Sequence, residues 1–245
     1  MAQNPKVLRI VDARDLGPVT RALEVECVVG DALDAIGGKY IIVHTGLSVG
    51  DKAVKRAYSL IPIAGTSHRA ELRIKRLAGG VGSSALHEAP IGAELSFSGP
   101  WGKLLPESGL ADRTLLVATD TGITSALGVA LHARETKTRA PSEVLWLRAA
   151  DERFLDLDLV RAEIEASGVR FVSTTIPAIG ALGRAAAAFG HIDARIMETS
   201  AELIIATGDG AIVHPLRERH AAAHAGVVRD VRIECFFHNP EKKSG

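Results

Sequence analysis

The N-terminal part of the chain alternates hydrophobic and polar positions over short segments, a pattern that predicts β-strands. In residues 71–77, Leu72 and Ile74 share one face, while Arg73 and Lys75 fall on the other. Comparable runs, rich in β-branched or aromatic residues, occupy residues 8–11, 22–29, 39–45, 56–63 and 93–99. Glycine-containing segments separate most of them. These six runs predict an antiparallel β-barrel or sandwich over residues 1–108.

The C-terminal part alternates strand-like and helix-like segments instead. Short apolar runs, the pattern of parallel strands buried on both faces, occupy residues 114–119, 143–149, 169–175, 202–207 and 231–237. Helical stretches are expected between them over residues 124–135, 156–167, 181–189 and 210–224. This order predicts an α/β domain over residues 109–245 with a doubly wound parallel five-stranded sheet. The polar segment 106–112 is the expected domain boundary.

Composition excludes several classes of function. Lys and Arg number 29, as do Asp and Glu, so no whole-protein charge favours nucleic acid or an anionic membrane. Cys27 and Cys235 are the only cysteines, too few for a four-cysteine iron–sulfur cluster. No run of about 18 apolar residues predicts a membrane span. The charged start lacks the apolar core of a signal peptide. We therefore expect a cytoplasmic protein.

A candidate anion site lies within the predicted barrel. Arg56 and Tyr58 share one face of a strand, and Ser59 adds a hydroxyl beside them. A guanidinium group pairs well with phosphate. The glycine-rich segment 79–84 precedes an apolar stretch that could be helical, and amides at a helix N-terminus favour anions. A pyrophosphate held between Arg56 and these amides would place an aromatic cofactor against Tyr58.

The segments R-A-Y-S (56–59), G-G-V-G-S-S (79–84), G-P-W-G (99–102) and A-T-D-T-G-I-T-S-A (118–126) resemble those of the ferredoxin–NADP⁺ reductase-like flavoproteins over nearly the whole chain. The resemblance implies a six-stranded Greek-key barrel that binds FAD and an α/β domain that binds NAD(P). The pyrophosphate loop favours FAD over FMN. The implied cofactor-binding residues are Arg56, Ala57, Tyr58, Ser59, Lys75, Gly80, Val81, Gly82, Ser83, Ser84, Thr121, Gly122, Thr124, Arg148 and Phe236.

The resemblance also implies roles for individual residues. Arg56 would bind FAD phosphate, Tyr58 would pack on the isoalloxazine ring, and Ser59 would hydrogen-bond near flavin N5. The sequence E-C-F at 234–236 resembles the family's Glu-x-aromatic ending. Phe236 would therefore cover the flavin face that nicotinamide must reach, and Glu234 would serve the proton network there. The implied catalytic residues are Ser59, Thr207, Glu234 and Phe236.

Both nucleotide loops depart from the family's pattern. Thr119 and Asp120 stand where A-G-G-T-G-I-T-P has its leading glycines, and Ser125 replaces the proline. Where the family has C-G-P, this chain has Thr207 and Asp209 in place of cysteine and proline. Thr207 keeps a polar atom at the nicotinamide position. A carboxylate such as that of Asp120 repels a bound pyrophosphate unless it points away or is paired.

Four further side chains leave alternatives open. Specificity for the 2′-phosphate of NADP is set after the second strand of such sheets. Arg148 and Arg153 in that segment suit a phosphate, whereas Asp151 suits a ribose hydroxyl, so NADPH and NADH both stay open. Lys75 either touches the cofactor or lies on an exposed strand edge.

No metal site is predicted. His220 and His224 have a spacing that can bind zinc, but Ala221 stands where the zinc-protease motif needs Glu, so a solvated helix face is the favoured interpretation.

The function implied by the resemblance is electron transfer. FAD would accept hydride from NADPH or NADH and pass electrons to a separate ferredoxin, oxygenase component or small molecule. Two alternatives remain. In one, Asp120 and Thr207 have impaired the nicotinamide site and the protein is a redox sensor or binding subunit. In the other, it is a flavin enzyme that acts on its own organic substrate.

Overall fold

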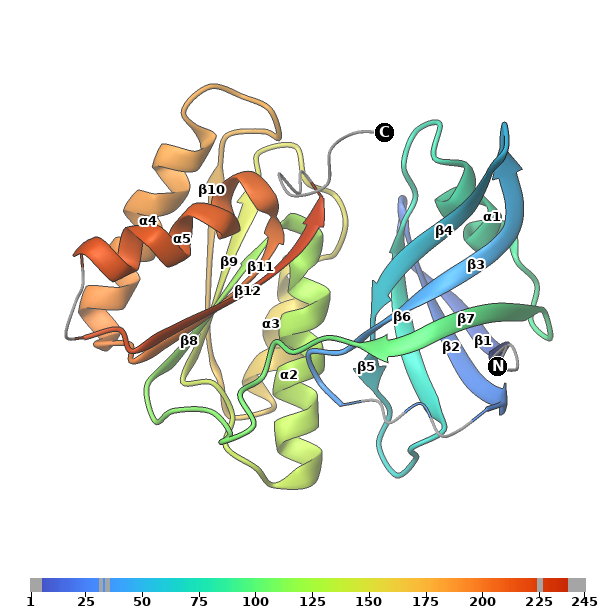
Figure 1. Ribbon diagram of the computed structural model, residues 1–245, viewed down its shortest axis with the longest axis horizontal. Coiled ribbons are helices and arrows are strands. Elements are labelled where there is room, and N and C mark those ends of the chain that lie inside the picture. The colour runs from blue at the N-terminus through green and yellow to red at the C-terminus, as the bar shows by residue number, and fades with distance from the viewer. Residues whose placement is uncertain (1–5, 31–32, 34–35, 224–226, 238–245) are drawn as a thin grey trace.

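Two sheets of different type make up the molecule (Figure 1). The structure is a computed structural model that describes residues 6–30, 33, 36–223 and 227–237. The first sheet is antiparallel and the second is parallel, as the sequence predicts. The first ends at Trp101 and the second begins at Thr114. The boundary expected at residues 106–112 lies between them, and the division at residue 108 stays a prediction.

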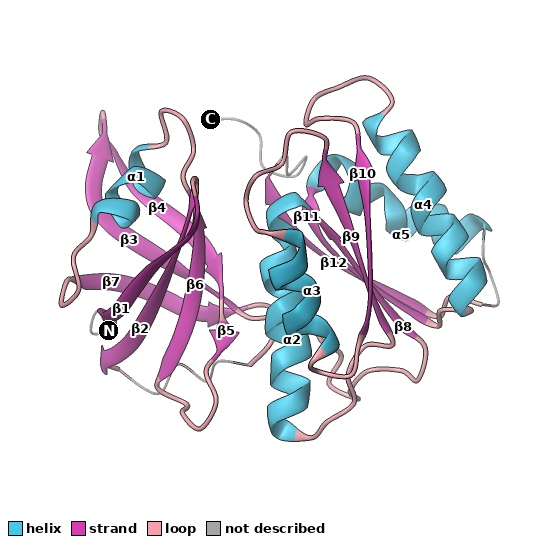
Figure 2. Cartoon of the chain, turned by 180° about the vertical axis from the view of Figure 1, so that it is seen from behind, coloured by secondary structure: helices cyan, strands magenta, loops and turns pink. Residues whose placement is uncertain are grey.

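The antiparallel sheet has seven strands in the order β4-β3-β7-β1-β2-β6-β5. It curls into an incompletely closed barrel around a core that includes Leu8, Leu23, Ile41 and Phe97. A single helix, α1, lies in the connection between β6 and β7 (Figure 2). The elements are β1 (Lys6–Gly17), β2 (Thr20–Val29), β3 (Tyr40–Val49), β4 (Lys52–Ser59), β5 (Ile61–Pro62), β6 (Arg69–Lys75), α1 (Val81–Glu88) and β7 (Glu94–Trp101).

The antiparallel sheet has seven strands, whereas the sequence predicts six. The segment predicted as one strand over residues 56–63 is two strands, β4 and β5, separated at Leu60. The amide of Leu60 donates to the carbonyl of Lys39 at 2.9 Å. Beyond this point the chain leaves β3 and pairs with β6 instead. The strand therefore turns a corner of the barrel at Leu60, which its continuous apolar sequence does not reveal.

The parallel sheet has the order β10-β9-β8-β11-β12, so the chain reverses direction across the sheet between β8 and β11. Helices cover both of its faces (Figures 1 and 2). One core contains Trp146 and residues of α2 and α3, and the other contains Ile192, Ile212 and residues of α4 and α5. The elements are β8 (Thr114–Thr119), η1 (Asp120–Gly122), α2 (Ile123–Thr136), β9 (Glu143–Ala149), α3 (Leu157–Glu165), β10 (Arg170–Ile176), α4 (Arg184–Thr199), β11 (Leu203–Asp209), α5 (Gly210–Ala223) and β12 (Asp230–Phe237).

Helix α4 begins later than residue 181, the predicted start. Gly180 and Gly183 have φ values of +82° and +79°, and the helix begins directly after Gly183. It then continues to Thr199, ten residues beyond the predicted end at residue 189. The isoleucines at 192 and 196 bury its second half against the sheet. No helix in the described part of the chain is long and apolar enough to cross a membrane.

Helix α2 packs directly on the barrel. A Cβ atom on Gly128 would lie 2.6 Å from the carbonyl oxygen of Leu60, and one on Gly37 would lie 2.3 Å from the carbonyl oxygen of Gly128. Real Cβ atoms do not approach that closely, so both positions require glycine at this backbone separation. The barrel and the α/β part are therefore in contact at backbone level where α2 passes Gly37 and Leu60.

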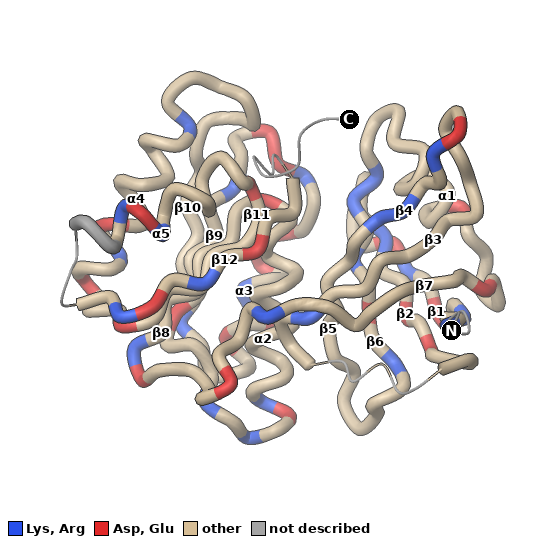
Figure 3. The backbone as a smooth tube through the Cα atoms, viewed as in Figure 1, with Lys and Arg blue, Asp and Glu red and all other residues tan. Residues whose placement is uncertain are grey.

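Charged side chains join the two parts beside α3. Arg73 of β6, with 2% of its side chain exposed, donates to Glu163 of α3 at 2.6 and 2.8 Å and to Glu71 at 2.6 Å. Lys75 donates to Glu152 at 2.7 Å. Elsewhere basic and acidic residues are interspersed over both parts (Figure 3), in keeping with a formal net charge of zero.

Replacement of glycine by alanine should have opposite effects on stability at Gly128 and at Gly190. Gly128→Ala forces α2 away from the backbone of Leu60 and should lower the free energy of unfolding by about 1–3 kcal/mol. The new Cβ of Gly190→Ala in α4 has no atom within 4 Å, so this substitution should raise the free energy of unfolding by about 0.5–1 kcal/mol. Urea unfolding of both variants measures the difference. A Gly128→Ala protein as stable as the Gly190→Ala protein would contradict the close approach.

Candidate functional site

Arg56 lies on the edge strand β4, beside the N-terminus of α1. Its side chain is exposed, and its guanidinium donates to the carbonyl of Lys55 at 2.7 Å. A Cβ atom on Gly82 would lie 3.1 Å from Cγ of Arg56 and 3.0 Å from Cγ1 of Val54. Gly82 thus lets the helix start close to the arginine. This arrangement fits the diphosphate of FAD, because a cation and a helix N-terminus lie together.

The glycine-rich loop shapes the start of α1. Gly79 has a φ of +70°, and no side chain caps the helix at Gly80. The hydroxyl of Ser83 accepts from the amide of Leu77 at 3.1 Å and donates to the carbonyl of Gly80 at 3.0 Å, while the Ser84 amide donates to the same carbonyl. Ser83 therefore holds the loop with its side chain. Amides in the first turn of a helix have no partner inside it and are suited to an anion.

Tyr58 and Ser59 follow at the end of β4. Tyr58 is partly buried against the barrel core, and burial raises the pKa of its hydroxyl to about 12, although the charge of Arg56 opposes that shift. Ala57, between Arg56 and Tyr58, is exposed. The hydroxyl of Thr124, in the first turn of α2, lies 3.3 Å from that of Ser59 and 3.0 Å from the carbonyl of Thr121. Predicted site residues of both parts therefore meet at Ser59.

Lys75 and Arg148, also predicted to bind cofactor, have protein partners. The ammonium group of Lys75 lies 2.7 Å from Oε1 of Glu152, whose side chain is 2% exposed. Nε of Arg148 donates to the hydroxyl of Ser173 at 3.1 Å, and its guanidinium carbon lies 5.5 Å from the centre of the Trp146 ring. Their roles toward a cofactor stay predictions.

The two loops predicted to bind the nucleotide, one at residues 119–124 and the other at residues 207–210, interlock at the C-terminal edge of the parallel sheet. A Cβ atom on Gly122 would lie 2.4 Å from the carbonyl oxygen of Thr207, and one on Gly208 would lie 2.3 Å from Oγ1 of Thr119. The buried hydroxyl of Thr207 donates to the carbonyl of Gly122 at 3.0 Å. That hydroxyl thus ties the loops together, and its predicted contact with nicotinamide is not tested.

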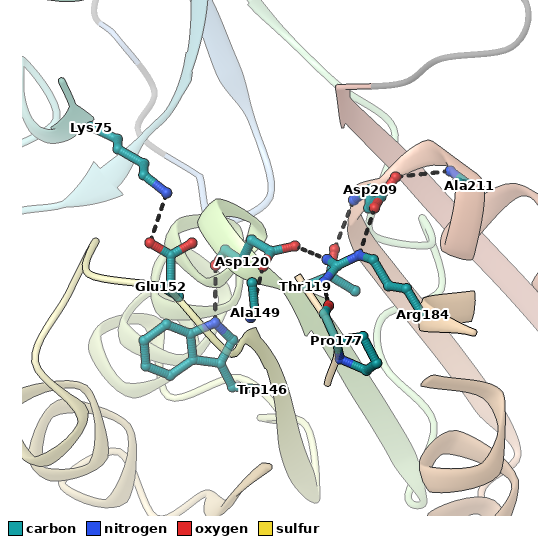
Figure 4. Close-up of polar contacts among 10 residues, drawn as sticks. All are labelled: Lys75, Thr119, Asp120, Trp146, Ala149, Glu152, Pro177, Arg184, Asp209 and Ala211. Atoms are coloured by element: carbon teal, nitrogen blue, oxygen red, sulfur yellow. Dashed lines mark hydrogen bonds and ion pairs between the residues drawn. The ribbon is translucent and has the colours of Figure 1, made fainter. Parts of the chain in front are cut away.

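The carboxylate of Asp120 is paired. Pairing is one of the two conditions, with pointing away, under which this charge does not repel a nearby pyrophosphate. The carboxylate accepts from the guanidinium of Arg184 and, at 3.0 Å, from the amide of Ala149 (Figure 4). Nε of Arg184 also donates to Asp209 at 3.1 Å. Burial raises the pKa of Asp120 to about 6, while Arg184 and the Ala149 amide oppose this. No motif in the sequence points to Arg184, which lies in an alanine-rich stretch.

Glu234 and Phe236 alternate with Cys235 along β12. Cys235 packs against the core on the α4 and α5 face, so Glu234 points to the opposite face. At Phe236 the pairing with β11 is irregular, because Cys235 pairs with Gly208 and Phe237 with Asp209. Burial raises the pKa of Glu234 to about 7, and burial together with the charge of Glu234 raises the pKa of Tyr40. Oε2 of Glu234 is buried and has no partner among the described residues. Glu234 also lines a cavity of about 400 Å³ with Lys103.

The predicted solvated helix face at His220 is wrong. His220 is 1% exposed and 3.8 Å from Asp193, so it does not lie on a solvated face; His224 lies outside the described residues. No group of three or more potential metal ligands occurs in the part of the chain that the structure describes.

Comparison with known proteins gives a consistent result. A sequence model described as the oxidoreductase FAD-binding domain matches residues 8–105. The chain is 32% identical over 219 residues to ferredoxin–NADP reductase B of Sorangium cellulosum (strain So ce56), covering 84% of this chain and 83% of that protein.

Solved structures share the fold. The ferredoxin reductase in carbazole 1,9a-dioxygenase has a TM-score of 0.72 at 20% identity, over 96% of this chain and 68% of that one. The FAD/NAD-binding domain of nitric oxide dioxygenase from Vibrio cholerae has a TM-score of 0.69 at 14% identity, over 96% and 99%. Phthalate dioxygenase reductase has a TM-score of 0.67 at 20% identity, over 95% and 68%.

The environment of Glu234 predicts a pH dependence of stability. Because its pKa is raised to about 7 from 4.5, the folded state holds its proton more tightly than the unfolded state, and stability falls as pH rises between these values. Glu234→Gln should remove this pH-dependent loss of stability, which is about 3 kcal/mol at most. Urea unfolding at pH 5, 6, 7 and 8 measures it, with the exposed Glu107→Gln as control. Equal slopes for both variants would contradict the assignment.

Proposed function

The chain belongs to the ferredoxin–NADP reductase family and is an FAD-containing, NAD(P)H-dependent oxidoreductase that transfers electrons; we propose that its acceptor is a separate iron–sulfur protein, either a ferredoxin or an oxygenase component. The observation that most directly supports a site shared by FAD and the nicotinamide is the contact of Ser59 with Thr124. It brings the end of the strand that carries Arg56 and Tyr58 against the first turn of α2, which follows the nucleotide loop.

The chain's residues would hold FAD at the barrel. Arg56 and the amides of Val81 and Gly82 would bind the diphosphate, with Ser83 and Ser84 maintaining the loop. Tyr58 would pack on the ring system, and the Ser59 hydroxyl would hydrogen-bond to its edge. Bound FAD supplies the redox chemistry, since it accepts two electrons from NAD(P)H together and releases them one at a time.

The nucleotide would bind at the C-terminal edge of the parallel sheet, where the strand order reverses between β8 and β11. Thr121, Gly122 and Thr124 form the loop that would receive its diphosphate at the start of α2. Arg148, near the end of β9, would contact the adenosine half. Phe236 would exclude water from the ring face until nicotinamide displaces it, and Glu234, with its raised pKa, would hold or release a proton there.

An iron–sulfur acceptor would not be held by the residues of this sequence. The two cysteines of this chain are too few for a four-cysteine cluster. The relative from Sorangium is named for ferredoxin, and phthalate dioxygenase reductase is described as transferring electrons from pyridine nucleotides to [2Fe–2S]. The pairing of Asp120 with Arg184 removes one of the two reasons for the sensor alternative, because the carboxylate is not left unpaired; Thr207 stays as the other.

Stopped-flow spectroscopy tests the whole proposal. The purified protein should be yellow, and mixing it with NADPH or NADH should bleach its absorbance near 450 nm. The bleached protein should then reduce a plant-type ferredoxin and be reoxidised. A protein that stays colourless with excess FAD, or a flavin that neither nicotinamide bleaches, would overturn the proposal. Reduction of ferricyanide but of no ferredoxin would overturn only the assignment of the acceptor.

Arg56 gives a sharper prediction. Arg56→Ala removes the cation from the proposed diphosphate site and should weaken FAD binding at least about tenfold, because a charge-assisted contact is lost. Fluorescence titration of the apoprotein with FAD measures it. Arg9→Ala is the matched control, since Arg9 is also exposed on a barrel strand but pairs with Glu94. Equal FAD affinity of both variants would show that Arg56 is not a ligand.

A further inference from the structure

Three charged side chains are buried together between the ends of β8 and β11. Asp120 and Asp209 have 1% of their side chains exposed and Arg184 has 5%. Each carboxylate uses one oxygen for Arg184 and the other for a backbone amide, that of Ala149 or Ala211, at 3.0 Å. Arg184 also donates to the carbonyl of Pro177 at 2.6 Å. One side chain from α4 therefore joins the segments that follow β8 and β10 to the end of β11 (Figure 4).

Asp120 directly precedes Thr121 and Gly122 of the nucleotide loop. It has a φ of +49°, in the left-handed region that favours glycine, and its carbonyl accepts from Nε1 of Trp146 at 2.9 Å. Backbone and side chain of Asp120 are thus both held. The carboxylate points toward β9 and Arg184, not into solvent. Arg184 therefore contributes to the conformation in which the loop begins.

The charges of this cluster matter to an anionic ligand. With both acids ionised, Arg184 reduces the formal charge of the cluster from −2 to −1. Removing one partner of a buried ionic group leaves the others uncompensated, which is much more costly than removing the group as a whole. Without Arg184, the negative charge of Asp120 beside the loop would repel the diphosphate of a dinucleotide more strongly.

We propose that Arg184 is a positioning residue for the nicotinamide dinucleotide: by pairing with Asp120 and Asp209, it partly compensates their negative charge beside the loop that receives the diphosphate. The inference rests on the proposed function, because it takes this loop to be the nucleotide site. Arg184 acts through the two acids and not by touching the nucleotide. Its effect should therefore depend on whether the acids are present.

Binding of ADP-ribose to the holoprotein, measured by titration calorimetry, tests this without turnover. Arg184→Ala should raise the dissociation constant at least about tenfold. In steady state, the KM for the nicotinamide should rise by a similar factor while kcat changes less than about threefold. Removing both acids as well, in the triple variant R184A/D120G/D209N, should restore ADP-ribose binding to within about threefold of wild type.

A matched control is available on the same helix. Arg195 of α4 pairs with Glu143 and Glu198, and its side chain is 12% exposed. Glu143 begins β9, so this cluster lies at the opposite edge of the sheet. Arg195→Ala should lower thermal stability and leave ADP-ribose binding unchanged. Retention of the 450 nm absorbance in every variant shows that the barrel is intact.

Each outcome decides something. If R184A binds ADP-ribose as wild type does, or if the triple variant binds as weakly as R184A, compensation of the acids is not the role of Arg184. If R184A does not fold, Asp120→Gly decides: it leaves Arg184 paired with Asp209 and should bind at least as tightly as wild type, so a tenfold loss overturns the inference. A wild-type protein that binds no ADP-ribose contradicts the proposed nucleotide site itself.

Discussion

The backbone contact between α2 and the barrel is the constraint on which both candidate sites depend. Gly128 and Gly37 let the helix lie against the carbonyl of Leu60 with no side chain between them. Because Leu60 follows Ser59 in the chain, the same contact fixes where β4 ends relative to the first turn of α2. The strand that carries Arg56 and the helix that begins at the nucleotide loop are thereby held together. A side chain at Gly128 would separate the two halves of the site before it touched any catalytic group.

Ionic contacts supplement this packing where the two parts meet beside α3. Arg73 is almost fully buried and pairs with Glu71 of its own strand β6 and with Glu163 of α3, so one of its two acidic partners is present only when the parts are joined. Lys75 and Glu152 form a second pair across the junction. Such pairs contribute more to orientation than to net stability, because desolvation offsets most of their attraction. Lys75, predicted as a cofactor contact or an exposed edge residue, therefore has a third role that requires the partner from the other part.

The sequence predicts features that are local in the chain and misses those that need distant partners. The fully apolar run 114–119 could only be a buried strand, and it is one. The corner at Leu60 was missed because its cause is the carbonyl of Lys39 and the change of partner from β3 to β6. The start of α4 was misplaced because alanines before Gly183 are as compatible with a helix as those after it. At the site, Asp120 was recognised as a departure from the family's pattern, but its partner is 64 residues away.

The cluster of Asp120, Arg184 and Asp209 shows why a changed motif does not by itself indicate a lost site. Glycine in a phosphate loop has two merits: it adopts a positive φ and brings no charge near the ligand. Asp120 adopts a φ of +49° while its carbonyl and carboxylate are held by Trp146, Ala149 and Arg184. Its charge is compensated by the same arginine that pairs with Asp209. The three residues thus form one unit, in which the acids require the arginine and the arginine, buried and always charged, requires at least one acid. Any one of them alone would be incompatible with an anionic ligand or with burial.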